Sequence, residues 1–201
     1  MSYDIPGDEA FPTIEELNAL PEAEFAAALT RLFEGGPRFL ARVAAMRPFE
    51  SDDELIGTAR EVAHAMPEAE QLELVAAHPR IGADPSLLSP ASHQEQGYGS
   101  DGEAGWDEDE DDGQEAPREP AHVAEELAML NEIYEAYFGF RYVVFVAGRP
   151  REAIIPLMEV AIRNDRDAEL RRAVDDTIYI AHDRLVGLRP PEPEPVPEEV
   201  G

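Results

Sequence analysis

Apolar residues recur at helical spacing along most of this chain, and proline or glycine interrupts each series. Residues 141–147 alone have a strand-like composition, and a single strand has no partner with which to form a sheet. The pattern therefore predicts an all-α, single-domain helical bundle of about seven to nine helices. Two clear series are Leu17, Leu20, Phe25, Leu29 and Leu32 near the start, and Val123, Leu127, Leu130 and Ile133 further along.

Helix boundaries follow from capping residues and from helix breakers. Thr13 can cap a first helix, and Pro21 should divide it into two. Pro79 disfavours helical geometry at the residue before it, so a helix should end near His78. Gly139 should end a long helix that begins near residue 120, and two more helices are expected at about 150–163 and 167–187.

Two segments do not fit a packed bundle. Residues 97–119 are rich in Gly, Asp and Glu, and the part from 101 to 119 has ten acidic residues against one arginine. Residues 189–201 are rich in proline and glutamate. We therefore expect one helical domain over residues 1–188, with a disordered acidic insertion at 97–119 and a disordered tail at 189–201.

Missing residue types exclude several chemistries. The 201 residues include no cysteine and no lysine, and all 16 basic residues are arginine. Thiolate nucleophiles, iron–sulfur clusters and Schiff bases are thereby excluded. A net charge of −28 argues against binding to nucleic acid or to anionic membranes. No apolar run approaches the length of a membrane span and no secretion signal is seen, so a cytoplasmic protein is expected.

His78 is the first candidate for chemistry. A histidine at the C-terminal end of a helix faces the negative end of the helix dipole, which favours the imidazolium form and suits a general acid. The alternative is a histidine that only caps the last carbonyl groups. The local sequence does not decide between the two.

Two further segments allow both a structural and a functional interpretation. Ser92 and Glu95 have the spacing of a capping box, and Ser89 with Pro90 is an alternative helix start. In the functional interpretation, Ser92, Glu95 and Gln96 form a polar surface at the start of a helix. Residues 134–149 are aromatic and apolar, and they suit either a core or the wall of a pocket. Arg141, Arg149 and Arg184 are candidates to bind an anion, although most arginines on an acidic surface are solvated.

Taken in this order, the segments resemble the 2-oxo-4-hydroxy-4-carboxy-5-ureidoimidazoline (OHCU) decarboxylases. The matching pieces are His78-Pro79-x-Ile81-Gly82, Ser92-x-x-Glu95-Gln96, Leu130-Asn131-x-x-Tyr134, Phe138-Gly139-Phe140, Gly148-Arg149 and Arg184-Leu185. The resemblance implies an all-α, usually dimeric enzyme without cofactor or metal. Such an enzyme removes CO₂ from OHCU to form (S)-allantoin in urate degradation.

The resemblance also implies roles for individual residues. His78 would donate the proton, and Glu95 would be the second catalytic residue. The substrate-binding residues would be Pro79, Ser92, Gln96, Phe140, Tyr142, Val143, Val144 and Arg184. Whether Arg149 or Arg184 contacts the substrate is left open.

The chain departs from the family pattern in the long acidic segment and at Arg80, where the family commonly has aspartate. Arg80 would oppose protonation of His78 if the two were close. Two other functions are considered. One is a non-enzymatic helical module that binds partners through its acidic segment. The other is a metal-dependent hydrolase that uses His78, His93 and Glu95.

Overall fold

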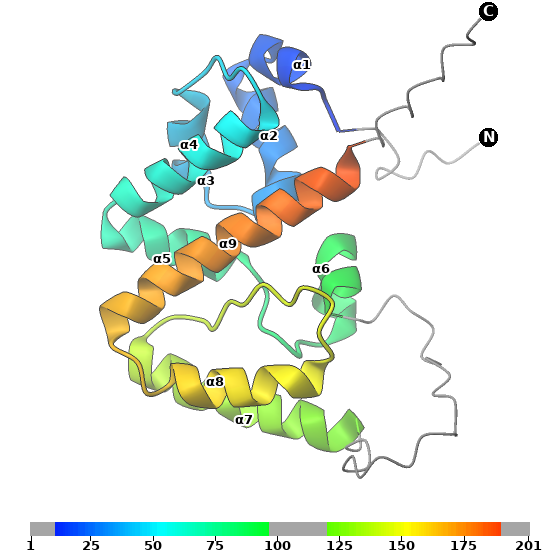
Figure 1. Cartoon of the computed structure of the whole chain (residues 1–201), viewed down its shortest axis with the longest axis vertical. Coiled ribbons are helices and arrows are strands. Elements are labelled where there is room, and N and C mark those ends of the chain that lie inside the picture. Colours follow the sequence, from blue (N-terminus) through cyan, green and yellow to red (C-terminus); the bar gives the residue numbers. More distant parts are fainter. Residues whose placement is uncertain (1–10, 97–119, 190–201) are drawn as a thin grey trace, which may run out of the picture.

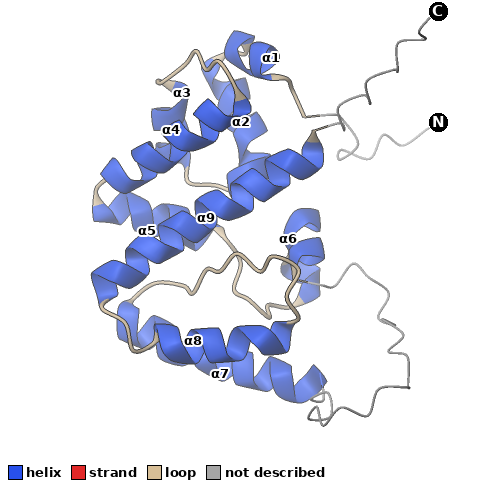
Figure 2. Cartoon of the chain, viewed as in Figure 1, coloured by secondary structure: helices blue, strands red, loops and turns tan. Residues whose placement is uncertain are grey.

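The computed structural model describes residues 11–96 and 120–189. Within these ranges the chain forms helices joined by loops and contains no strand (Figure 2), as predicted for an all-α protein. The expected acidic insertion at 97–119 and nearly all of the expected tail lie outside the described residues. The extent of the domain therefore stays a prediction.

The first half of the described chain contains five α-helices. They are α1 (Ile14–Ala19), α2 (Glu22–Phe33), α3 (Pro37–Ala44), α4 (Asp52–Ala65) and α5 (Glu68–Ala77). The second half begins with a 3₁₀ turn, η1 (Pro85–Leu87), and the short helix α6 (Pro90–Glu95). It continues with α7 (Pro120–Phe138), the 3₁₀ turn η2 (Arg151–Ile154), α8 (Ile155–Ala161) and α9 (Arg166–Leu188).

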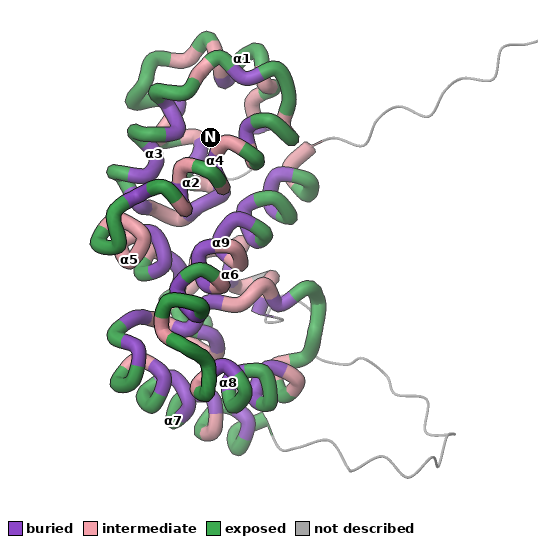
Figure 3. Tube along the Cα trace, turned by 60° about the vertical axis from the view of Figure 1, so that its left-hand side comes forward, coloured by how far each residue is buried: buried purple, intermediate pink, exposed green. Residues whose placement is uncertain are grey.

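The long helix α9 organises the bundle. It runs diagonally across the molecule, with α1–α5 on one side and α6–α8 on the other (Figure 1). It packs against α2, α4 and α5, and α7 packs against α8. The purple, buried parts of the trace mark these facing sides (Figure 3). The face of α9 in the core shows the helical repeat of apolar residues at Leu170, Ala173, Val174, Ile178, Ala181 and Leu185.

The breakers and caps act where the sequence predicts. Thr13 forms a full capping box with Glu16, and α1 and α2 are separated at Pro21. Helix α5 ends at Ala77, before His78 and Pro79. Gly139 follows α7 with φ of 81°, a left-handed conformation that glycine adopts without strain.

Two expectations need refinement. The region 150–163 is a 3₁₀ turn followed by the shorter helix α8, and α9 begins at Arg166 because Asp165 caps it. The strand-like run at 141–147 forms no strand: residues 141–146 are irregular and Ala147 lies in a turn, with φ of 52°. None of the described helices combines the length and the apolar character needed to cross a membrane.

Candidate active site

His78 is held at the end of α5 and faces the interior. Its backbone is extended, with φ of −75° and ψ of 143°, because Pro79 prevents another helical turn. The residue is only 3% exposed. Its Nε2 atom is buried and has no hydrogen-bond partner among the described residues. A buried, unpaired polar atom is costly and often marks a functional group.

The expectation of a protonated His78 is wrong for the unliganded protein. Burial, followed by the positive charge of Arg184, lowers the pKa of His78 to about 4, although Glu34 acts in the opposite direction. Desolvation therefore outweighs the helix dipole from which the sequence argument started. Arg80 is not the neighbour responsible, since its guanidinium pairs at the surface with Glu135.

Arg184 of α9 lies at the centre of a buried polar cluster, although its partners in the cluster are distant from it in the sequence. Its Nε and Nη2 atoms bind both carboxylate oxygens of Glu95, at 2.5 and 2.8 Å. The same Nη2 also donates to Glu34 at 2.9 Å and to the hydroxyl of Ser92 at 3.1 Å. Nη1 donates to the carbonyl of Leu32. The cluster joins the end of α2, the helix α6 and α9.

Glu34 belongs to this cluster, although the sequence pattern does not single it out as a site residue. It follows α2 in a left-handed conformation, with φ of 61°. Burial would raise the pKa of Glu34, but hydrogen bonds from Ser89 and Ser92 and the charge of Arg184 lower it. A carboxylate at the negative end of a helix is unfavourable, and this was the available signal that Glu34 has a specific partner.

The helix start at α6 resolves one of the open alternatives. Ser89 is the residue whose Oγ accepts from the backbone N–H of Ser92, so Ser89 acts as the cap. Ser92 lies within the helix and is 2% exposed. Its hydroxyl is therefore available to the buried cluster.

Gln96 holds the loop that follows His78. Its Oε1 accepts from the backbone N–H of Gly82 at 2.8 Å, and its Nε2 donates to the carbonyl of Arg80 at 3.1 Å. Asn131 of α7 donates to the carbonyl of Ile81 in the same loop at 3.0 Å. Both ends of the Gln96 amide are thus engaged with the backbone of this loop.

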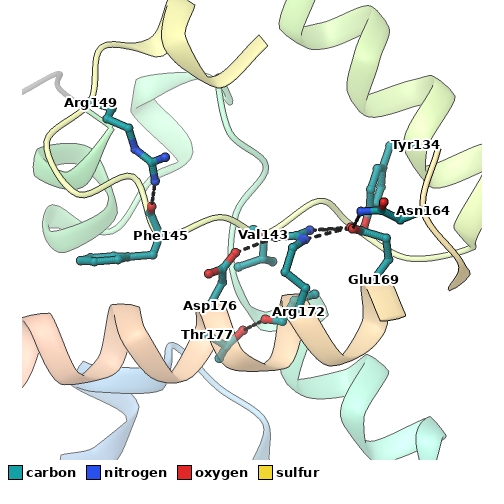
Figure 4. Close-up of polar contacts among 10 residues, drawn as sticks. Tyr134, Val143, Phe145, Arg149, Asn164, Glu169, Arg172, Asp176 and Thr177 are labelled. Carbon is teal, nitrogen blue, oxygen red and sulfur yellow. Dashed lines mark hydrogen bonds and ion pairs between the residues drawn. The ribbon is translucent and has the colours of Figure 1, made fainter. Parts of the chain in front are cut away.

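Arginines hold the unpaired segment 140–148 in place. Arg172 of α9 donates to the carbonyl of Val143 at 2.8 Å, and Arg149 donates to the carbonyl of Phe145 (Figure 4). Arg141 binds the carbonyl of His78 at 2.9 Å and so links this segment to the end of α5. Arg149 is therefore turned toward its own loop, while Arg184 lies in the buried cluster.

Glu169 accepts a hydrogen bond from Arg172 and also links α9 to α7. Glu169 accepts from Arg172, from Asn164 and from the hydroxyl of Tyr134 at 2.8 Å (Figure 4). Burial, above all, raises the pKa of Tyr142 to about 12. Phe140, Tyr142 and Val143 are buried in the hydrophobic core and Val144 packs against it, so this part of the segment is not a surface loop. Arg172 was not singled out from the sequence.

His78 lines neither of two surface hollows of the protein, and no group of metal-binding side chains is found among the described residues. Within residues 11–96 and 120–189, no three His, Asp or Glu side chains are grouped as ligands of one metal ion would be. Two shallow hollows lie elsewhere: one of about 300 Å³ lined by α4 and α9, and one of about 400 Å³ lined by α2 and α3. His78 itself is buried and enclosed by protein.

Comparison with known proteins identifies the family. The family model described as OHCU decarboxylase matches residues 18–186. A 2-oxo-4-hydroxy-4-carboxy-5-ureidoimidazoline decarboxylase from Haloferax volcanii is 28% identical over 86% of this chain and 94% of its own length. The uric acid degradation bifunctional protein PucL from Bacillus subtilis is 26% identical over 88% of this chain and 32% of its own length.

The fold agrees with this assignment. A crystal structure of OHCU decarboxylase in the presence of (S)-allantoin matches with a TM-score of 0.56 and 24% identity, over 77% of this chain and 92% of that one. At this identity the likeness concerns the fold alone. The match of the family model over residues 18–186 shows that the chain belongs to the OHCU decarboxylase family.

Proposed function

We propose that this protein is a carboxy-lyase that converts OHCU to (S)-allantoin in urate degradation, without a cofactor. The observation that carries the proposal is the buried, unpartnered Nε2 of His78 close to the charged cluster of Arg184, Glu34 and Glu95. The names of the relatives agree with this activity. The interaction-module alternative depends on residues 97–119, which lie outside the described part of the chain.

The substrate supplies its own electron sink. When the bond to the carboxylate breaks, CO₂ leaves and the electron pair passes into the adjacent carbon–nitrogen system of the ring. A proton must then reach the ureido-bearing ring carbon on one face, which fixes the configuration of the product. The protein therefore has to orient the ring, exclude water and deliver one proton.

The lowered pKa of His78 is compatible with proton donation if the substrate binds as an anion. With His78 neutral, Arg184, Glu34 and Glu95 have a combined charge of −1. A bound substrate carboxylate adds a further negative charge in a buried space and raises the pKa of His78. Substrate binding is then coupled to uptake of a proton by His78, which donates it after CO₂ has left.

Glu95 is the member of the cluster best suited to exchange partners. Its side chain is 26% exposed, whereas that of Arg184 is 4% exposed. A substrate carboxylate can replace Glu95 on Arg184, and Glu95 can then accept hydrogen bonds from the ring or ureido N–H groups. Ser92 would complete the polar side of the site, while Gln96 would hold the loop after Pro79 through its two hydrogen bonds to the backbone. The apolar wall would come from Phe140, Tyr142, Val143 and Val144.

The test is turnover of freshly generated OHCU, followed by circular dichroism of the allantoin formed. Wild-type protein should accelerate the appearance of the (S)-enantiomer without added metal. His78→Gln should lose at least 100-fold in kcat, on the order expected for loss of a general acid. His122→Gln, at an exposed histidine on α7, is the matched control and should retain full activity. Wild-type rates no faster than the blank would refute the proposal.

Two further expectations belong to the same proposal. The family resemblance implies a homodimer, which sedimentation equilibrium would detect as twice the chain mass. The sequence also favours a cytoplasmic location, which cell fractionation would test. Both stay predictions.

A further inference from the structure

One carboxylate oxygen of Glu34 accepts three hydrogen bonds. The donors are Ser89 Oγ at 2.6 Å, Ser92 Oγ at 2.5 Å and Arg184 Nη2 at 2.9 Å. An ionised carboxylate can only accept, so both hydroxyl groups must donate to it. A serine hydroxyl has a single hydrogen, and that of Ser92 is therefore committed to Glu34.

The remaining capacity of Ser92 is as an acceptor. Its oxygen already accepts from Arg184 Nη2 at 3.1 Å and retains lone-pair capacity for one more donor. Because Ser92 is buried, water does not readily reverse this arrangement. A ligand atom that meets this oxygen must bring a hydrogen, whereas a carbonyl or carboxylate oxygen would meet a lone pair.

We propose that Glu34 is a positioning residue that fixes the Ser92 hydroxyl as an acceptor and thereby selects a substrate with an N–H group at that point. The inference rests on the proposed function, because OHCU offers ring and ureido N–H groups. Local structure does not favour Glu34 where it lies, in a left-handed conformation at the C-terminal end of α2. Its three hydrogen bonds to the site offset that cost.

The test compares Glu34→Gln, Ser92→Ala and the double variant, with steady-state kinetics on OHCU. A glutamine at position 34 can offer its amide N–H to Ser92 and so allows the hydroxyl to turn. Each single variant should raise KM at least tenfold. The KM of the double variant should be no more than twofold above that of the single variant with the higher KM, because both changes remove the same interaction. Glu73→Gln, at a surface pair with Arg38, is the matched control and should leave KM unchanged.

A purely structural role for Glu34 gives a different result. In that case Glu34→Gln would have a lower urea midpoint than wild type, but its KM would stay within twofold of wild type. The effects of the two single changes on KM would also multiply in the double variant. These results would overturn the inference. If Glu34→Gln does not fold, titration of ¹³C-labelled glutamate by NMR decides the question in Ser92→Ala. Loss of the hydroxyl donor should raise the pKa of Glu34, and an unchanged pKa would overturn the inference.

The two proposals can fail separately. A wild-type protein with no activity on OHCU would refute the proposed function. The NMR titration would still report whether Ser92 donates to Glu34.

Discussion

His78 should make the stability of the fold depend on pH in a window set by its burial. The unfolded chain binds the histidine proton with a pKa near 6.5, and the folded protein does so only at about 4. The unfolded state therefore holds more protons between these values, so stability falls as the pH drops below 6.5. At 1.36 kcal/mol per pH unit the full effect is about 3 kcal/mol, of which about 2 kcal/mol is lost at pH 5.

The measurement compares wild type with His78→Gln by urea unfolding at pH 7.5 and pH 5.0. The variant has no titrating group at this position. Between pH 7.5 and pH 5.0, the free energy of unfolding of wild type should therefore fall by about 2 kcal/mol more than that of the variant. Glu34, whose pKa is lowered, also loses stability on acidification, but it is present in both proteins and cancels to first order. NMR of the imidazole gives the folded pKa directly. A pKa of 6 or higher, with a pH-independent difference in stability, would refute the reasoning.

Two further predictions concern charge. Arg184→Met should lower the free energy of unfolding by about 3–5 kcal/mol, because it leaves the partly buried Glu34 and Glu95 without their cation; a loss below about 1 kcal/mol in urea would contradict this. Raising NaCl from 0.05 to 1 M should raise the thermal midpoint, since screening relieves the self-repulsion of a chain with net charge −28. A midpoint that is unchanged in scanning calorimetry would show that this repulsion does not affect stability.

The helices were predictable because their signals are short-range. Thr13, Pro21, Pro79 and Gly139 each act on a neighbouring turn, and each marks an observed boundary. The unpaired state of residues 141–147 was also predictable, because no second strand-like run was available. By contrast, the division of 150–163 was not predicted, although Pro156 near the start of α8 has no backbone N–H and cannot continue a preceding α-helix.

The electrostatics of the site were harder to predict. Glu34 and Arg184 are 150 residues apart in the sequence, and no spacing rule brings them together. The pKa of His78 was predicted in the wrong direction because the sequence shows the helix end but not the desolvation. Arg80 was the suspected neighbour because it is close in the sequence, yet it pairs with Glu135 on α7.

The position of α9 has a consequence for synthesis of the chain. This helix comes last among the described elements, yet α2, α4 and α5 all bury their apolar faces against it. While residues 166–188 are still inside the ribosome, those earlier helices have no surface that can complete their core. Folding should therefore be delayed until α9 has emerged, and nascent chains without it should expose apolar surface to chaperones and proteases.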